Sequence, residues 1–119
     1  MKIPGPDHPI IIAPHPRHVR VMFNGTVVAD TRRALALRES TYPVVLYIPR
    51  HDVDANLLER TGNVTHCPYK GAASYYAIKV GDKTSPDAVW SYEAPFAAVA
   101  EIAGHLAFYR NRVDAIDET

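Results

Sequence analysis

Alternating apolar and polar positions recur in short stretches along the chain and predict β-strands. The clearest stretch covers residues 19–29, where Val19, Val21 and Phe23 fall on one side of an extended backbone. Asn24-Gly25 follows them. This dipeptide suits a type I′ turn, because both central residues of that turn have positive φ. The pattern therefore predicts a β-hairpin over residues 19–29.

Three further segments favour strands. Residues 34–39 alternate leucine with alanine and arginine, although these residue types also suit a helix, which is the alternative here. Residues 44–48 form an apolar, partly β-branched run between two prolines, which indicates a strand buried on both faces. Residues 74–80 alternate again, so Tyr75 and Tyr76 are expected on opposite faces of a sheet. Shorter extended segments are expected at residues 88–92, 106–109 and 113–116.

Two short helices are expected among these strands. Asp52 is placed to cap the first helix, which would run through Leu58. Pro95 suits the first turn of a second helix near residues 95–103, because the N–H that proline lacks would have no partner there. Gly104 would end that helix.

Proline and glycine mark the remaining segments. Residues 1–16 carry five prolines, and proline has no N–H for a sheet ladder, so this segment is predicted to be an extended N-terminal arm. Residues 64–71 contain both Pro68 and Gly71 and are predicted to form a loop. Residues 81–87 are predicted to form a second, polar loop.

The expected fold is mainly β. Strands outnumber helices and do not alternate with them regularly, which argues against a parallel sheet built from βαβ units. A sandwich, a barrel or a folded antiparallel sheet with one or two short helices fits the pattern best. A chain of 119 residues is expected to form a single domain over residues 1–119.

Composition and charge argue against several classes of function. The chain is 47% hydrophobic and 22% charged, with thirteen basic and thirteen acidic residues, so it lacks the basic excess of a nucleic-acid-binding protein. No apolar run has the length of a signal peptide or a membrane span, so no membrane partner is expected and the cytoplasm is the expected location. The single cysteine, Cys67, excludes an internal disulfide and a multi-cysteine zinc site.

Several distinctive motifs lie between about residue 17 and residue 116. The most specific is Thr65-x-Cys67-Pro68-Tyr69-Lys70-Gly71, preceded by Tyr47-Ile48-Pro49-Arg50 and followed by Trp90-x-Tyr92 and Ala107-Phe108-Tyr109. In sequence and spacing these motifs resemble the DUF427 family. The resemblance implies a compact β domain similar to the β-tent folds of zinc-binding proteins, although this chain lacks the cysteine pairs that those proteins use. It also implies the loose label of nucleotidyltransferase.

The main candidate for a ligand-binding site is the Cys-Pro-Tyr-Lys-Gly segment. Lysine offers a point charge and arginine a two-pronged fork for an anion, and aromatic side chains can line a pocket for a flat ligand. The candidate ligand-binding residues are Arg50, Cys67, Tyr69, Lys70, Trp90 and Tyr92. Each has a structural alternative: a buried cysteine, surface salt bridges, and aromatic packing in the core. A nucleophilic role for Cys67 is a further alternative, but His66 would point to the opposite side of an extended backbone.

No metal site or cofactor is expected. Among the six histidines, His15 and His18 are three apart but lie beside prolines, and no third ligand is evident from spacing. Asp52 and Asp54 are the only closely spaced carboxylates in the middle of the chain, and nucleotidyl transfer needs carboxylates that hold a metal ion.

The sequence does not identify a reaction. The favoured hypothesis is a small-molecule-binding or accessory domain that takes a small anionic or aromatic ligand. The alternatives are a nucleotidyltransferase-type enzyme, thiol chemistry at Cys67, or a structural interaction domain. Assembly into a homo-oligomer is left open.

Overall fold

The computed structural model describes all residues, 1–119, and is mainly β. The strands are β1 (Ile10–Pro14), β2 (Val19–Phe23), β3 (Thr26–Thr31), β4 (Leu35–Glu39), β5 (Val45–Tyr47), β6 (Leu58–Cys67), β7 (Gly71–Val80), β8 (Lys83–Ser91), β9 (Ala107–Phe108) and β10 (Ala115–Glu118). The helical elements are short 3-10 turns: η1 (Arg50–Asp52), η2 (Ala55–Leu57), η3 (Ala97–Ile102) and η4 (Arg110–Arg112).

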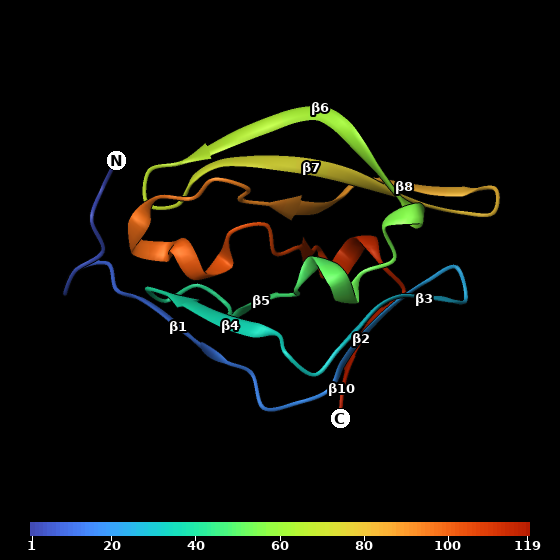
Figure 1. The fold of residues 1–119 in the computed structure, drawn as a ribbon, viewed down its shortest axis with the longest axis horizontal. Coiled ribbons are helices and arrows are strands. Elements are labelled where there is room, and N and C mark those ends of the chain that lie inside the picture. Colours follow the sequence, from blue (N-terminus) through green and yellow to red (C-terminus); the bar gives the residue numbers. More distant parts are fainter.

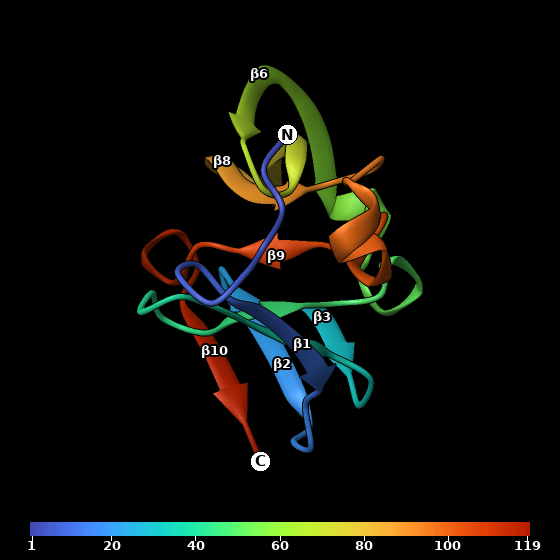
Figure 2. The same ribbon diagram turned by 90° about the vertical axis from the view of Figure 1, so that its left-hand side faces the viewer.

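The strands form three antiparallel sheets, in the orders β1-β4-β5, β10-β2-β3 and β6-β7-β8-β9. Figure 1 shows the long β6, β7 and β8 across the top of the molecule, with the two three-stranded sheets below them. In the turned view of Figure 2, β9 lies between these upper and lower layers. The mainly antiparallel β fold expected from the sequence is therefore confirmed.

The hairpin expected at residues 19–29 is present as β2 and β3. Val19 pairs with Thr31 and Phe23 with Thr26, and a bulge follows Val21. Asn24 and Gly25 have φ values of 49° and 73°, the left-handed conformation that a type I′ turn requires. Residues 34–39 also form the expected strand, so the helical alternative is wrong.

Two hydrophobic clusters fill the interior, and β7 contributes to both. Tyr76 and Ile78 belong to a cluster of thirteen buried residues that also includes Val19 and Val21. Tyr75 belongs to a second cluster of eight buried residues, which includes Tyr92. Successive side chains of a strand point to opposite faces, so the expected separation of Tyr75 from Tyr76 is confirmed.

The strand expected at residues 44–48 is shorter and less buried than its composition suggested. β5 covers Val45–Tyr47 and is the edge strand of its sheet. Val44 exposes 37% of its surface, whereas Tyr47 and Ile48 are almost completely buried. Burial on both faces is thus limited to the end of the strand, because the chain beside β5 approaches it only there, through a bridge between Ile48 and Leu106.

Both predicted loops are mostly strand. β6 continues to Cys67, and only residues 68–70 form the turn before β7. Pro68 interrupts no ladder, since it comes after the last paired residue of β6. Gly71, at φ 109°, supplies a backbone conformation that other residues rarely adopt. The second loop is reduced to a turn at residues 81–82, because β8 already begins at Lys83.

The helices near residues 52–58 and 95–103 are 3-10 turns rather than α-helices. A 3-10 helix has three residues per turn, so residues three apart lie on the same side. Phe96, Val99 and Ile102 therefore face inward. Asp54, and not Asp52, caps η2, with its side chain accepting a hydrogen bond from the Asn56 N–H at 3.1 Å.

The N-terminal arm is extended and joins a sheet. Its residues Ile10–Pro14 form β1, which pairs with β4 from Ile10–Glu39 to Pro14–Leu35. Farther toward the N-terminus, the Lys2 N–H donates to the Pro68 carbonyl at 2.7 Å, so the arm reaches the β6–β7 turn. No helix in the structure is long and apolar enough to cross a membrane.

Candidate functional site

A pocket of about 340 Å³ lies between the β4–β5 pair and strands β7 and β8. We call it the tyrosine pocket, because four buried or half-buried tyrosines line it together with the single tryptophan. Its lining consists of Leu37, Glu39, Tyr42, Pro43, Val45, Tyr47, Lys70, Tyr75, Trp90, Tyr92 and Tyr109. Apolar walls with a few polar groups are typical of small-molecule sites, which span about 300–1,000 Å³.

A buried ion pair forms one wall of the tyrosine pocket. The Lys70 ammonium donates to Oε1 of Glu39, and the two residues expose only 7% and 9% of their surfaces. The other carboxylate oxygen, Oε2, lies 2.8 Å from Nε2 of His8. The lysine charge is therefore balanced by a carboxylate inside the protein.

The β6–β7 turn positions Lys70. The turn ends at Gly71, and the Phe96 N–H donates to the Lys70 carbonyl at 3.0 Å, which fixes the backbone against the segment before η3. The Lys70 Nζ also lies 5.8 Å from the centre of the Tyr92 ring, within the range of a cation–π contact. Both contacts hold the ammonium at the pocket wall.

The environment of Glu39 favours its ionised form. Burial on its own raises the pKa of this carboxyl, but the hydrogen bonds and positive charge of Lys70 and the contact with His8 outweigh burial and hold the pKa below its ordinary value. Glu39 therefore carries its charge at neutral pH, and the ion pair is formed.

The hydroxyls of Tyr47, Tyr92 and Tyr109 are hydrogen-bond donors and acceptors rather than charged groups. Burial raises the pKa of Tyr47 and Tyr92 well above the ordinary value, and it raises the pKa of Tyr109 to about 12. Tyr75 bonds Thr65 at 2.9 Å, and the Trp90 indole donates to the Tyr47 hydroxyl at 3.4 Å.

Among the four buried or half-buried tyrosines of the pocket, only Tyr92 has a hydroxyl without a hydrogen-bond partner in the protein. The residue is 7% exposed and lines the tyrosine pocket. This hydroxyl is open to the pocket rather than sealed in the core, because Ser91 Oγ is the one fully buried side-chain polar atom of the protein that lacks a partner. A ligand in the pocket would supply the missing partner.

A second pocket of about 330 Å³ adjoins the first. We call it the valine pocket. It shares Pro43, Val45, Trp90 and Tyr109 with the tyrosine pocket. Its other lining residues are apolar except for Arg110: Val19, Val21, Val44, Leu46, Ile48, Phe108 and Ile116.

Three of the six candidate residues meet in the tyrosine pocket, namely Lys70, Trp90 and Tyr92. The other three do not line it. Tyr69 stacks on His8, with ring centres 4.0 Å apart and nearly parallel planes. Arg50 lies at the opposite face of the sheet, where its guanidinium approaches the Tyr76 hydroxyl at 3.5 Å and Glu93 at 3.6 Å.

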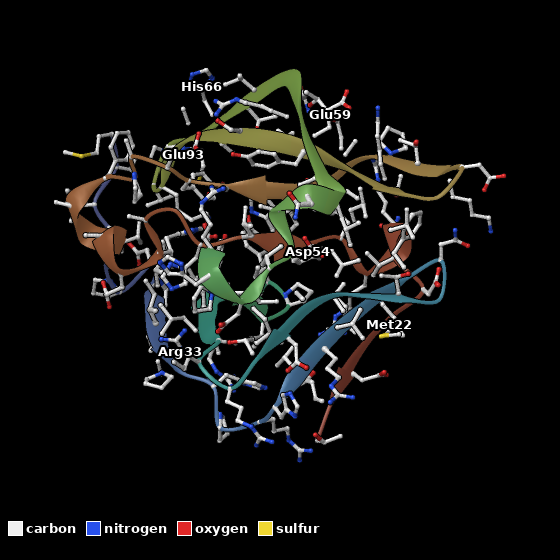
Figure 3. The ribbon with its side chains drawn as sticks, turned by 45° about the vertical axis from the view of Figure 1, so that its right-hand side comes forward. Met22, Arg33, Asp54, Glu59, His66 and Glu93 are labelled. Atoms are coloured by element: carbon white, nitrogen blue, oxygen red, sulfur yellow. The ribbon has the colours of Figure 1, made fainter.

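Cys67 is half-buried and packs against the second hydrophobic cluster. His66, its neighbour in β6, is exposed, and Figure 3 shows it on the outer side of that strand. The two side chains thus leave the strand in opposite directions, as expected from an extended backbone. His66 is not placed to act as a base for the thiol.

Two charged or titratable groups of the site escaped the sequence analysis, Glu39 and His8. Glu39 follows Leu35 and Leu37 at a spacing of two, on the inward face of β4. A carboxylate on the apolar face of a strand indicates a buried partner, so the signal was present. His8 gave no such signal, because it lies in the arm and reaches Glu39 only through the pairing of β1 with β4.

The carboxylates considered as metal ligands have other contacts. Asp52 accepts hydrogen bonds from the Thr31 hydroxyl at 2.7 Å and from Arg33 at 3.3 Å. Asp54 caps η2 and lies beside these turns in Figure 3. No group of three or more His, Cys, Asp or Glu side chains is arranged to hold a metal ion.

Fold and pockets together define a small antiparallel β protein with an aromatic cavity beside a buried ion pair. The chain belongs to the family described as a domain of unknown function, DUF427, whose model matches residues 11–119. The resemblance seen in the sequence motifs is thereby confirmed. A search of curated proteins finds no match to this chain.

Proposed function

We propose that this protein binds a small, flat, neutral molecule in the tyrosine pocket. The single observation that supports this most strongly is the Tyr92 hydroxyl, which belongs to a 7% exposed residue, lines the cavity and has no partner in the protein. A ligand carbonyl or similar acceptor would take the hydrogen bond that Tyr92 offers. Burial keeps the pKa of Tyr92 high, so the hydroxyl retains its proton at neutral pH.

The charges around the pocket favour a neutral ligand over an anion. Lys70 is paired with Glu39, so its ammonium leaves little uncompensated positive charge for an anionic group. The rings of Tyr47, Trp90 and Tyr109 offer flat apolar faces, and Tyr47 and Trp90 meet edge to face with centres 6.4 Å apart. A planar ring is the shape that such walls fit best.

The alternative of nucleotidyl transfer has no observation in its favour at this pocket. The only carboxylate in the pocket lining, Glu39, already contacts Lys70 and His8. Thiol chemistry fares no better, since Cys67 lies outside the pocket lining and its neighbour His66 faces away. The pocket therefore supports a binding function over either reaction.

A thermal-shift screen of small aromatic amides, ketones, nucleosides and aromatic acids tests the proposal. A compound present at about 100 times its Kd stabilises the folded state by about 2.7 kcal/mol. Replacing Tyr92 by Phe should weaken the best neutral hit about fivefold to tenfold, because one hydrogen bond of about 1–1.5 kcal/mol is lost. The stability of the free protein should stay within about 0.5 kcal/mol of wild type, because no internal bond is broken.

Tyr76→Phe is the matched control, since it removes a hydroxyl from the opposite face of the same sheet. Its hydroxyl donates to Glu93 at 3.2 Å and does not reach the tyrosine pocket. Equal affinity of the hits for wild type, Tyr92→Phe and Tyr76→Phe would place binding elsewhere and contradict the proposal. A screen in which no compound stabilises the protein would favour a purely structural role.

A further inference from the structure

The two pockets meet beside the free edge of β5. Pro43 and Val45 form one side of the shared wall, and Trp90 and Tyr109 form the other. The Trp90 and Tyr109 rings are tilted against each other, with centres 4.4 Å apart. The four shared residues place the two cavities side by side.

The course of β5 leaves its outer backbone edge unpaired beside the shared lining residues. β5 ends its sheet, and the Ile48 and Leu106 backbones exchange two hydrogen bonds of 2.8 Å at an isolated bridge. Residues 44–46 precede this bridge and have no paired strand on that side. Side chains of this segment alternate between the two hydrophobic clusters: Tyr47 packs with the second cluster, and Leu46 and Ile48 pack with the first.

The two cavities differ in chemistry. The tyrosine pocket offers the Tyr92 hydroxyl and the Lys70–Glu39 pair. The valine pocket offers ten hydrophobic lining residues out of twelve, and its one charged residue, Arg110, is 3.6 Å from Glu118. A polar group gains no partner among aliphatic walls, whereas an alkyl group gains about 0.8 kcal/mol per methylene buried.

We infer that the ligand of this protein is an amphiphile, with a planar hydrogen-bonding head in the tyrosine pocket and an aliphatic tail in the valine pocket. This inference rests on the proposed function and adds to it the class of ligand. The head is held by Tyr92 and the aromatic rings. The tail passes between Val45 and the Trp90–Tyr109 pair.

The test uses benzamide and its 4-propyl, 4-butyl and 4-hexyl derivatives, titrated into the wild-type protein by calorimetry. The head is constant, so changes in affinity report the tail alone. We expect the affinity to rise with chain length by up to roughly fourfold per methylene, the factor that corresponds to full burial of each added group. Affinity that is independent of tail length, or no binding by any member of the series, would overturn the inference.

A pair of variants locates the tail. Val44 lines the valine pocket and is 37% exposed, whereas Val27 is similarly exposed at 40% but lies outside both pockets. Val44→Trp should reduce the affinity for 4-butylbenzamide at least about tenfold, which corresponds to about half of the gain expected from burying its tail. The affinity for benzamide should stay unchanged. Val27→Trp should change the affinity for neither compound.

The outcomes separate the two proposals. Compounds that bind through Tyr92 without any tail dependence would leave the proposed function standing and contradict the amphiphile. Tail dependence that persists fully in Val44→Trp would place the tail outside the valine pocket and would also contradict it. The wild-type series gives its answer even if Val44→Trp folds poorly.

Discussion

Lys70 and Glu39 form a buried ion pair that joins the β6–β7 turn to the end of β4. The two residues are 31 positions apart in the chain, and together they make one wall of the tyrosine pocket. The pair satisfies the lysine, limits the free positive charge in the cavity and connects through His8 to the N-terminal arm. It is both a structural contact and a part of the candidate site.

Breaking this pair should be costly. Lys70→Met leaves the Glu39 carboxylate buried with only His8 beside it, so we expect a loss of about 3 kcal/mol in the free energy of unfolding, the low end for such pairs. Urea denaturation at neutral pH measures it. Lys79→Met is the control, because Lys79 pairs with Glu59 at the surface, where both side chains are at least half exposed and the loss should stay below about 1 kcal/mol.

The double variant Lys70→Met/Glu39→Leu separates charge from packing. It removes both charges together, and replacing a whole buried pair by apolar groups is often neutral or stabilising. We expect it to be more stable than Lys70→Met alone. A double variant no more stable than Lys70→Met would contradict this expectation, and one less stable than wild type would mean that the pair contributes more than its desolvation costs.

Acid should destabilise the protein partly through Glu39. The pKa of this carboxyl is lower in the folded state than its ordinary value of 4.5, so the unfolded state binds the proton first as the pH falls. The stability from Glu39 is therefore present above about pH 4.5 and is lost as the pH falls through the folded-state pKa. Urea midpoints between about pH 5 and pH 3 should fall less steeply in Glu39→Gln than in wild type.

The exposed Glu101 provides the control for this experiment. Glu101→Gln should keep the wild-type dependence on pH, because the exposed Glu101 side chain makes no ion pair or hydrogen bond in the fold. Identical slopes for wild type and Glu39→Gln would show that the Glu39 carboxylate is not stabilised by its partners.

Cys67 should react slowly with thiol reagents. Its side chain is half-buried against the second cluster, and no base is placed to activate it. We expect Cys67 to react with a chromogenic disulfide much more slowly in native buffer than in the urea-unfolded chain. A native rate equal to that of the unfolded chain would contradict this burial, and a faster one would revive the thiol-enzyme alternative.

Local signals predicted the local parts of this fold. Asn24-Gly25 indicates the β2–β3 hairpin because both residues adopt the positive φ values that a type I′ turn requires. The facing of Trp90 and Tyr92 into one pocket also follows from their spacing along an extended segment. These features depend on neighbours in sequence, which is why the sequence was sufficient.

Long-range pairing defeated the prediction elsewhere. Pro68 and Gly71 correctly indicated a turn, but the predicted loop was too long. The ladder between β6 and β7 extends as far as the pair Cys67–Gly71 and leaves only three residues in the turn. The ion pair between Glu39 and Lys70 depends on how the β4–β5 pair packs against the β6–β7 turn. Neither segment's own sequence pattern indicates that the two segments are in contact. Tyr69 and Arg50 lie outside the tyrosine pocket for the same reason, because their positions also depend on long-range packing.

The most direct test of the tyrosine pocket uses Trp90, the single tryptophan of the chain, which lies in the wall shared by both pockets. Its emission can be followed selectively while a stabilising compound from the screen is titrated. We expect a saturable change with one site per chain and a midpoint that rises about fivefold to tenfold in Tyr92→Phe. A compound that stabilises the protein yet leaves the Trp90 emission unchanged at saturation would contradict binding in this pocket.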